Sequence, residues 1–167
     1  NLLQQEVSVG GTRKEVTVFF SDIRGFTKFS EGHTPEEVVS MLNEYFEVMV
    51  GIIGRHGGVV DKFIGDAIMA VWGVPAGTDH DTLNGLKDCL EMRSALVTLN
   101  ESRRQRNLTE IHIGMGLHAG TAISGTIGSE ERMEFTVIGD TVNVTARIES
   151  STKHFEVDLL VSDEVFN

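Results

Sequence analysis

The sequence predicts an α+β domain with a ferredoxin-like split βαβ core and a C-terminal extension of one helix and one strand. Three observations predict it. Several short segments alternate between apolar and polar residues, as strands do. Two long segments between them repeat apolar residues at helical spacing. The order is strand, helix, strand, strand, helix, strand. We therefore expect an antiparallel-type sheet with helices on one face, and a second copy of the chain as an economical cover for the other.

Length and charge narrow the possible function classes. The 167 residues are enough for one domain with its own core. A net charge of −11 argues against nucleic acid or an anionic lipid surface as the main partner. Carboxylates that face a phosphate need a cation between them, so a metal-dependent site is compatible with this charge. No apolar run approaches 18 residues and no signal peptide is visible, so we expect a soluble segment without membrane contact.

The first strand is predicted at residues 15–21, after a polar lead-in at residues 1–14. Asp22 follows at the C-terminal end of this strand, before a bend at Gly25 and a short helix. Ligand-binding groups in α/β sheets commonly lie at such strand ends, whereas aspartate is also a frequent helix N-cap. Both interpretations of Asp22 stand at this point.

The first long helix begins at Thr34, which is predicted as its N-cap. Pro35 suits the first helical position, and Glu37 completes a capping box. Helical spacing predicts one buried face made of Val39, Leu42, Phe46, Met49 and Ile53.

Residues 59–72, VVDKFIGDAIMAVW, predict two short apolar strands joined by a tight turn. Gly65 suits the turn because glycine adopts positive φ without steric cost. Lys62 and Asp66 are charged residues in an apolar hairpin, where unpaired burial is expensive. They either form an ion pair with each other or bind a ligand. The second carboxylate, Asp22, at the end of another strand favours the ligand.

The second long helix is predicted at residues 79–106. Its expected apolar stripe contains Leu83, Leu86, Leu90, Ala95 and Leu99, and its basic end at residues 103–106 is expected to be solvated. The single cysteine, Cys89, lies in this pattern as a core residue, and one thiol is compatible with a reducing, cytoplasmic location.

The next strand, residues 111–117, places Gly114 and Gly116 on one face, which indicates close approach by another backbone or by a ligand. A glycine-punctuated arm and a strand follow, up to residue 138. A helix then begins with Asp140 as the expected N-cap. Asn143 and Arg147 share one face of that helix, either as functional groups or as solvated polar residues. A last strand is predicted at residues 157–161.

Three segments, FFSDIRGFT, DKFIGDAIMAVWG and EFTVIGDTVNVTARIES, resemble signature segments of the class III nucleotide cyclase catalytic domain. The resemblance is closest to bacterial adenylate cyclases and places the domain at residues 15–167. It implies a phosphorus–oxygen lyase of intracellular signalling that converts ATP to 3′,5′-cyclic AMP and pyrophosphate. A guanylate cyclase and a catalytically inactive, cyclase-like dimerisation module are the alternatives.

The resemblance also implies roles for individual residues. The carboxylates of Asp22 and Asp66 and the carbonyl of Ile23 would hold two divalent cations, Mg²⁺ or Mn²⁺. Asn143 would orient the ribose, and Arg147 would stabilise charge on the α-phosphate.

The adenine base would be read by Lys62, which donates to N1, and by Thr136, which accepts from the N6 amino group. Guanylate cyclases usually carry Glu and Cys at these positions. In family homodimers the two metal-binding aspartates come from one subunit and the other side chains from its partner. All are present here, so the resemblance implies a homodimer with two shared active sites. The family continues into a C-terminal hairpin, which we expect beyond Asn167, and we expect fusion to sensor or membrane domains in a longer parent protein.

Overall fold

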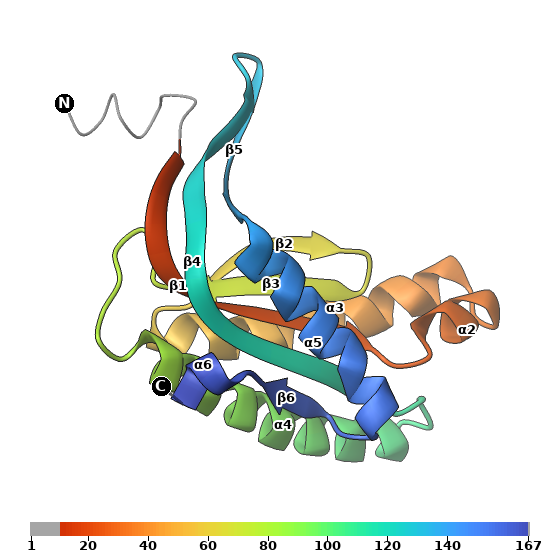
Figure 1. The fold of residues 1–167 in the computed structure, drawn as a ribbon. Helices are drawn as coiled ribbons and strands as arrows, with labels where there is room; N and C mark the ends of the chain where they lie inside the picture. The colour runs from red at the N-terminus through yellow and green to blue at the C-terminus, as the bar shows by residue number, and fades with distance from the viewer. Residues whose placement is uncertain (1–10, 167) are drawn as a thin grey trace.

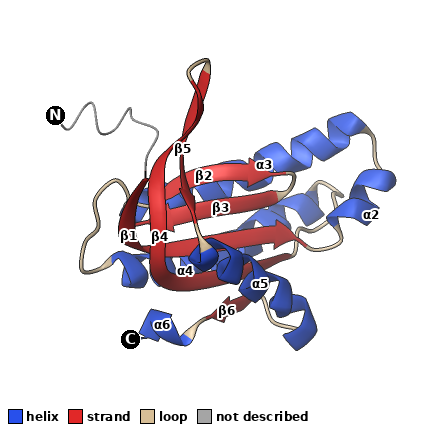
Figure 2. Cartoon of the chain, turned by 45° about the horizontal axis from the view of Figure 1, so that its top comes forward, coloured by secondary structure: helices blue, strands red, loops and turns tan. Residues whose placement is uncertain are grey.

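The computed structural model describes residues 11–166, which form one six-stranded sheet with helices on both of its faces (Figures 1 and 2). The strands are β1 (Gly11–Ile23), β2 (Val59–Ile64), β3 (Ala67–Trp72), β4 (Ile113–Ser129), β5 (Arg132–Ile138) and β6 (Leu159–Val161). The helices are α2 (Phe26–Glu31), α3 (Pro35–Ile53), the 3₁₀ turn η1 (Gly54–His56), α4 (Asp81–Gln105), α5 (Asp140–Phe155) and α6 (Asp163–Phe166). Within the described part, no helix is both long and apolar enough to span a bilayer.

The strand order is β2-β3-β1-β4-β5, with every pair on this path antiparallel and β6 parallel to β4. This confirms the predicted α+β class with an antiparallel-type sheet, whereas the expectation of helices on one face is wrong, because α5 packs on the face opposite α3 and α4. β1 starts at Gly11, inside the predicted lead-in, and pairs with β4 along its whole length; residues 1–10 of that lead-in lie outside the described residues. β2 and β5 are the first and last strands in this order. They are nevertheless in contact, because the long β4 bends and β5 folds back toward β2 (Figure 1).

The two faces of β1 belong to two separate apolar clusters. Phe19 and Ile23 pack with α3 and α4, the two long helices, which lie on one face as predicted. Val18 and Phe20 point to the other face, where their cluster packs against Val142 and Ala146 of α5. The appended helix α5 therefore packs on the opposite face from the two core helices.

The predicted capping box of α3 is present, with Thr34 and Glu37 bonded to each other's backbone N–H groups. The predicted buried stripe is wrong at Val39, which is 55% exposed. Met41 and Tyr45 are buried instead. Tyr45 can lie on the buried face of α3 because its hydroxyl is 2.9 Å from the Ser21 hydroxyl, which gives its polar end a hydrogen-bond partner without water.

The stripe predicted for α4 is also wrong at Leu83 and Leu90, which are 48% and 47% exposed. Cys89 is buried as predicted, together with Met92 and Leu96. The face of α4 that packs on the sheet therefore contains Cys89, Met92 and Leu96 and leaves Leu83 and Leu90 outside it.

Polar residues complete the buried face of α4. The Asn100 side-chain amide donates to the Ile111 carbonyl at 2.8 Å and accepts from the Ile111 N–H at 2.7 Å. Arg103, predicted as part of a solvated end, is buried, donates to the Thr109 carbonyl and lies 3.2 Å from Glu44. Hydrogen-bonded polar groups can thus replace apolar ones, which hydrophobic spacing alone does not reveal.

Candidate active site

Two predicted metal ligands come together at the C-terminal end of β1. Asp66 follows Gly65 in the turn between β2 and β3, and Gly65 has the left-handed φ of +61° that the turn requires. The backbone N–H of Ile23 donates to Asp66 Oδ2 at 2.8 Å. This bond fastens the turn to the end of β1, directly beside Asp22.

The Asp22 carboxylate is only partly compensated by protein groups. Its Oδ1 atom is buried and accepts no hydrogen bond within the described residues. Its Oδ2 atom lies 3.8 Å from the Lys153 ammonium. A buried carboxylate oxygen without a donor is costly, and a hard cation is a ligand that removes this cost. The residues therefore fit a divalent cation at this end of the sheet.

Glu149 is a third carboxyl group at this place, and the sequence analysis missed it. Its Oε2 atom is also buried without a hydrogen-bond donor. Burial, followed by the nearby charge of Asp22, raises the pKa of Glu149 to about 8. We call Asp22, Asp66 and Glu149 the carboxylate end.

The predicted close approach at Gly114 and Gly116 explains how Glu149 reaches this position. A Cβ atom on Gly116 would lie 2.6 Å from the backbone nitrogen of Glu149, and one on Gly114 would lie 2.4 Å from the Thr152 hydroxyl. The two glycines therefore let the backbone of α5 lie directly on β4, which confirms the prediction of close backbone approach.

A second polar group joins β2 to β5. The Thr136 hydroxyl donates to Asp61 Oδ2 at 2.7 Å, and the Lys62 ammonium lies 3.9 Å from the same oxygen. We call Asp61, Lys62 and Thr136 the base edge. Lys62 therefore lies near Asp61. The ion pair between Lys62 and Asp66, one of the two interpretations of the sequence, does not form among the described residues. Asp61 directly precedes Lys62, but no pattern in the sequence indicated a role for it.

Asn143 and Arg147 lie one turn apart on α5, and both are exposed. Gly139 is the N-cap of this helix, and Asp140, the expected cap, is the first helical residue. The side chains of Asn143 and Arg147 make no hydrogen bond or ion pair within the described residues. Likewise, no such contact among residues 11–166 links the carboxylate end to the base edge.

Large apolar side chains are exposed on the strands around these groups. They are Val59, Phe63 and Ile64 on β2, Ile123 and Ile127 on β4, and Met133, Phe135 and Ile138 on β5. Each is at least 36% exposed. Ile138 pairs with Ile123 on one face of β5, whereas Met133 and Phe135 point to its other face, so apolar groups are exposed on both faces of this arm. Exposed apolar groups in such number commonly mark a protein interface.

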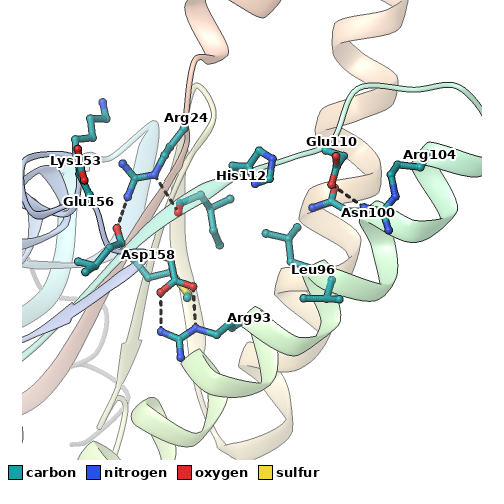
Figure 3. A pocket seen from close by; sticks show the side chains of 14 residues that line it. Arg24, Arg93, Leu96, Asn100, Arg104, Glu110, His112, Lys153, Glu156 and Asp158 are labelled. Atoms are coloured by element: carbon teal, nitrogen blue, oxygen red, sulfur yellow. Dashed lines mark hydrogen bonds and ion pairs between the residues drawn. The ribbon is translucent and has the colours of Figure 1, made fainter.

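A cavity of about 640 Å³ lies between α4, β4 and the end of α5 (Figure 3). Arg93 donates two hydrogen bonds to the Asp158 carboxylate, and Arg104 donates to Glu110 at 2.8 Å. The walls of this cavity include Lys153 but neither Asp22 nor Asp66. Arg93 and Arg104 are therefore already paired with carboxylates of the cavity wall.

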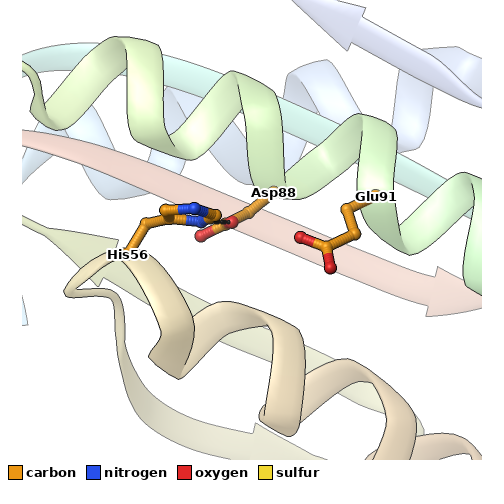
Figure 4. A group of neighbouring side chains, drawn as sticks. All are labelled: His56, Asp88 and Glu91. Atoms are coloured by element: carbon orange, nitrogen blue, oxygen red, sulfur yellow. Dashed lines mark hydrogen bonds and ion pairs between the residues drawn. The ribbon is translucent and has the colours of Figure 1, made fainter.

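Another group with metal-binding residue types is formed by His56, Asp88 and Glu91, whose candidate ligand atoms lie within 4.8 Å of one another (Figure 4). His56 Nδ1 contacts Asp88 Oδ1, and Trp72 Nε1 donates to Asp88 Oδ2 at 3.2 Å. Glu91 pairs with Arg55. Since protein groups already satisfy these carboxylates, we interpret the group as a polar link between η1 and α4.

The comparisons with known proteins agree with the fold. The family model of the adenylate and guanylate cyclase catalytic domain matches residues 10–167. An adenylate cyclase of Anabaena cylindrica is 40% identical over 164 residues, which are 96% of this chain and 32% of that protein. Adenylate cyclase 1 of Rhizobium meliloti is 38% identical over 153 residues, which are 92% of this chain and 23% of that protein, so the chain spans a third or less of both relatives.

Solved structures of both nucleotide specificities are similar to the chain. The adenylyl cyclase CyaB from P. aeruginosa superposes with a TM-score of 0.87 at 35% identity, over 95% of this chain and 81% of that one. The guanylyl cyclase Cya2 has a TM-score of 0.81 at 42% identity, over 85% of this chain and 72% of that one. The chain therefore belongs to the family of adenylate and guanylate cyclase catalytic domains.

Proposed function

We propose that this chain is the catalytic domain of an adenylate cyclase that converts ATP to 3′,5′-cyclic AMP and pyrophosphate. The ribose 3′-oxygen forms a bond to the α-phosphorus, and the bond from that phosphorus to the bridging oxygen of the β-phosphate breaks. The hydroxyl proton passes to solvent, and pyrophosphate leaves. The family membership and the names of the adenylate cyclases that match support this assignment.

The observation that carries the proposal is the carboxylate end. Asp22 and Asp66 lie side by side at the end of β1, and Asp22 Oδ1 is buried without a donor. In the proposed site, these carboxylates and the carbonyl of Ile23 would hold two divalent cations, Mg²⁺ or Mn²⁺. Such ions would lower the pKa of the ribose 3′-hydroxyl and neutralise charge on the phosphates.

Asn143 and Arg147 supply the remaining polar groups of the proposed site. Both are exposed on α5, and neither side chain is engaged within the described residues. Asn143 orients the ribose by hydrogen bonding. Arg147 donates to the α-phosphate as negative charge grows there, and a preorganised donor of this kind contributes about 10²–10³ in rate.

Two copies of the chain form the proposed enzyme. Each site takes Asp22 and Asp66 from one subunit and Lys62, Thr136, Asn143 and Arg147 from the other. The exposed apolar side chains of β2, β4 and β5 support such an association, because a second copy would remove them from water. The absence of contact between the carboxylate end and the base edge within the described part of one chain is compatible with this division.

Adenine is the proposed base. Lys62 donates to N1, which is an acceptor in adenine, and Thr136 accepts from the N6 amino group. A guanylate cyclase is the second candidate, because Cya2, a guanylyl cyclase, is 42% identical to this chain. We further propose that the chain works inside a longer signalling protein, as its curated relatives are at least three times its length.

The test is a product assay by HPLC, with ATP and GTP offered separately in Mg²⁺ and in Mn²⁺. Cyclic AMP formed at a higher kcat/KM than cyclic GMP supports the proposal. A preference for GTP would replace it by the second candidate. Neither product, from a protein that is folded and dimeric, would favour an inactive dimerisation module.

A further inference from the structure

Asp61 occupies an irregular position in β2. The pairing of β2 with β3 shifts between Val60 and Lys62, since Val60 pairs with Ala70 and Lys62 with the neighbouring Met69. Asp61 is therefore the extra residue of a β-bulge. In a regular strand, neighbouring side chains point to opposite faces, whereas a bulge re-aims one of them. The bulge accounts for the proximity of the Asp61 carboxylate and the Lys62 ammonium, which lie 3.9 Å apart.

The Asp61 carboxylate determines the direction of the Thr136 hydroxyl. An ionised carboxylate only accepts hydrogen bonds, whereas a threonine hydroxyl has one proton to donate and two lone pairs. Thr136 donates that proton to Asp61 Oδ2 at 2.7 Å. Both groups are well shielded from water, with the Asp61 side chain 6% exposed and Thr136 6% exposed. The Thr136 oxygen is thereby left with only lone pairs for a ligand.

This direction matters because a threonine hydroxyl by itself does not distinguish the two purines. It can accept from the N6 amino group of adenine, and it can equally donate to the O6 carbonyl of guanine. Lys62 does not exclude guanine either, because its ammonium can donate to adenine N1 or to guanine O6. A hydroxyl that already donates its proton to Asp61 can accept a hydrogen bond from the adenine N6 amino group. Against guanine O6 it would place one acceptor opposite another.

We propose that Asp61 is a positioning residue for base selection, which keeps the Thr136 hydroxyl an acceptor and so disfavours guanine. The inference rests on the proposed function, because it names what sets the base preference of the same site. Asp61 itself does not touch the nucleotide in this proposal. It acts through Thr136, and the bulge in β2 is what brings its carboxylate to that hydroxyl.

The test compares wild type, Asp61→Ala, Asp61→Asn, Thr136→Val and the double variant Asp61→Ala/Thr136→Val. For each, kcat/KM is measured with ATP and with GTP. Binding is measured by displacement of a fluorescent ATP analogue with each nucleotide. Asp61→Ala frees the hydroxyl proton, so we expect the ATP/GTP ratio to fall about tenfold, the size of one mismatched hydrogen bond. Asp61→Asn retains an acceptor oxygen and should lie between wild type and Asp61→Ala.

The double variant separates positioning from a merely structural link between β2 and β5. Without a hydroxyl at position 136, loss of Asp61 should leave the ATP/GTP ratio of Thr136→Val unchanged. A structural link alone predicts that Asp61→Ala lowers melting temperature and the use of both nucleotides equally, and an unchanged ratio would overturn the inference. Wild-type protein that binds ATP over GTP without turnover would contradict the proposed function, while the binding ratios would still decide the role of Asp61.

Discussion

The carboxylate end and the base edge both withdraw a carboxylate from water, and they compensate for it differently. At the base edge, Asp61 accepts from the Thr136 hydroxyl and lies beside the Lys62 ammonium. At the carboxylate end, Asp22 Oδ1 has no donor within the described residues, and Glu149 adds a second uncompensated oxygen. The base edge is therefore organised by its own residues, whereas the carboxylate end is left to be completed by a ligand.

The difference assigns different tasks to the two regions. The Asp22 carboxylate, which has a buried oxygen without a donor within the described residues, repels further negative charge and attracts cations, so a triphosphate needs bound metal ions there. A group whose hydrogen bonds are already fixed presents a defined pattern of donors and acceptors to a base.

The largest effect is expected from removing an aspartate of the carboxylate end. Asp22→Ala and Asp66→Ala should each lower kcat/KM for ATP by at least about 10²–10³-fold, because the remaining carboxylate holds the two cations too weakly. Asp22→Ala should change the melting temperature little, whereas Asp66→Ala also removes the acceptor of the Ile23 N–H and should lower it. Asp79→Ala, at an exposed loop position, is the matched control and should retain activity. Wild-type turnover in either active-site variant would refute the metal assignment.

A change at the base edge should alter which nucleotide is used and leave the reaction itself intact. Lys62→Glu with Thr136→Cys replaces the adenine pair by the residues usual in guanylate cyclases. Each mismatched buried hydrogen bond costs about 1–3 kcal/mol, so the ATP/GTP ratio of kcat/KM should fall about ten- to hundredfold. Steady-state kinetics with both nucleotides measures the ratio. An unchanged ratio would show that these two residues do not read the base.

The smallest effect concerns stability without metal. The folded state raises the pKa of Glu149 to about 8 through burial and the charge of Asp22, so it binds the proton more tightly than the unfolded chain. This contribution to stability is complete below the ordinary pKa, near 4.5, and is lost as the pH rises toward 8. The wild-type melting temperature in EDTA should therefore fall across this window.

Glu149→Gln cannot titrate and should lose that part of the pH dependence. At pH 8 it should melt higher than wild type by several degrees, since about 1 kcal/mol shifts the melting temperature of a domain this size by about 2–4 °C. Glu101→Gln, at an exposed position of α4, is the control and should follow the wild type. A Glu149→Gln profile with the wild-type slope would contradict the raised pKa.

The fold class was predictable because strand alternation, helical spacing and a capping box are local signals. The structure confirms the order of elements, the turn at Gly65 and the position of Asp22 at the end of β1. The buried faces of α3 and α4 were predicted less well. Tyr45 and Asn100 are buried with their polar groups bonded, and spacing rules that count apolar residues pass over them.

The two residues missed at the site depend on contacts between distant segments. Glu149 reaches Asp22 because Gly114 and Gly116 let α5 lie on β4, and the sequence showed only the two glycines. Asp61 meets Thr136 through a bulge and through the return of β5 over β2, and no local pattern indicates either. The roles of Asn143 and Arg147 stay predictions, since their side chains are exposed and unengaged within the described residues.

The measurement that tests the account most directly is a mixing experiment between two inactive variants. Asp22→Ala loses the carboxylate end and Arg147→Ala loses the phosphate donor, so neither homodimer has a complete site. If sites are shared, a mixed dimer has one site made entirely of intact residues. Random exchange of equal amounts should then restore about a quarter of wild-type cyclic AMP formation, because half of the dimers are mixed and each has one working site. Mixed dimers shown to form by differential tagging, yet without activity above either variant alone, would contradict a site built from two copies of this chain.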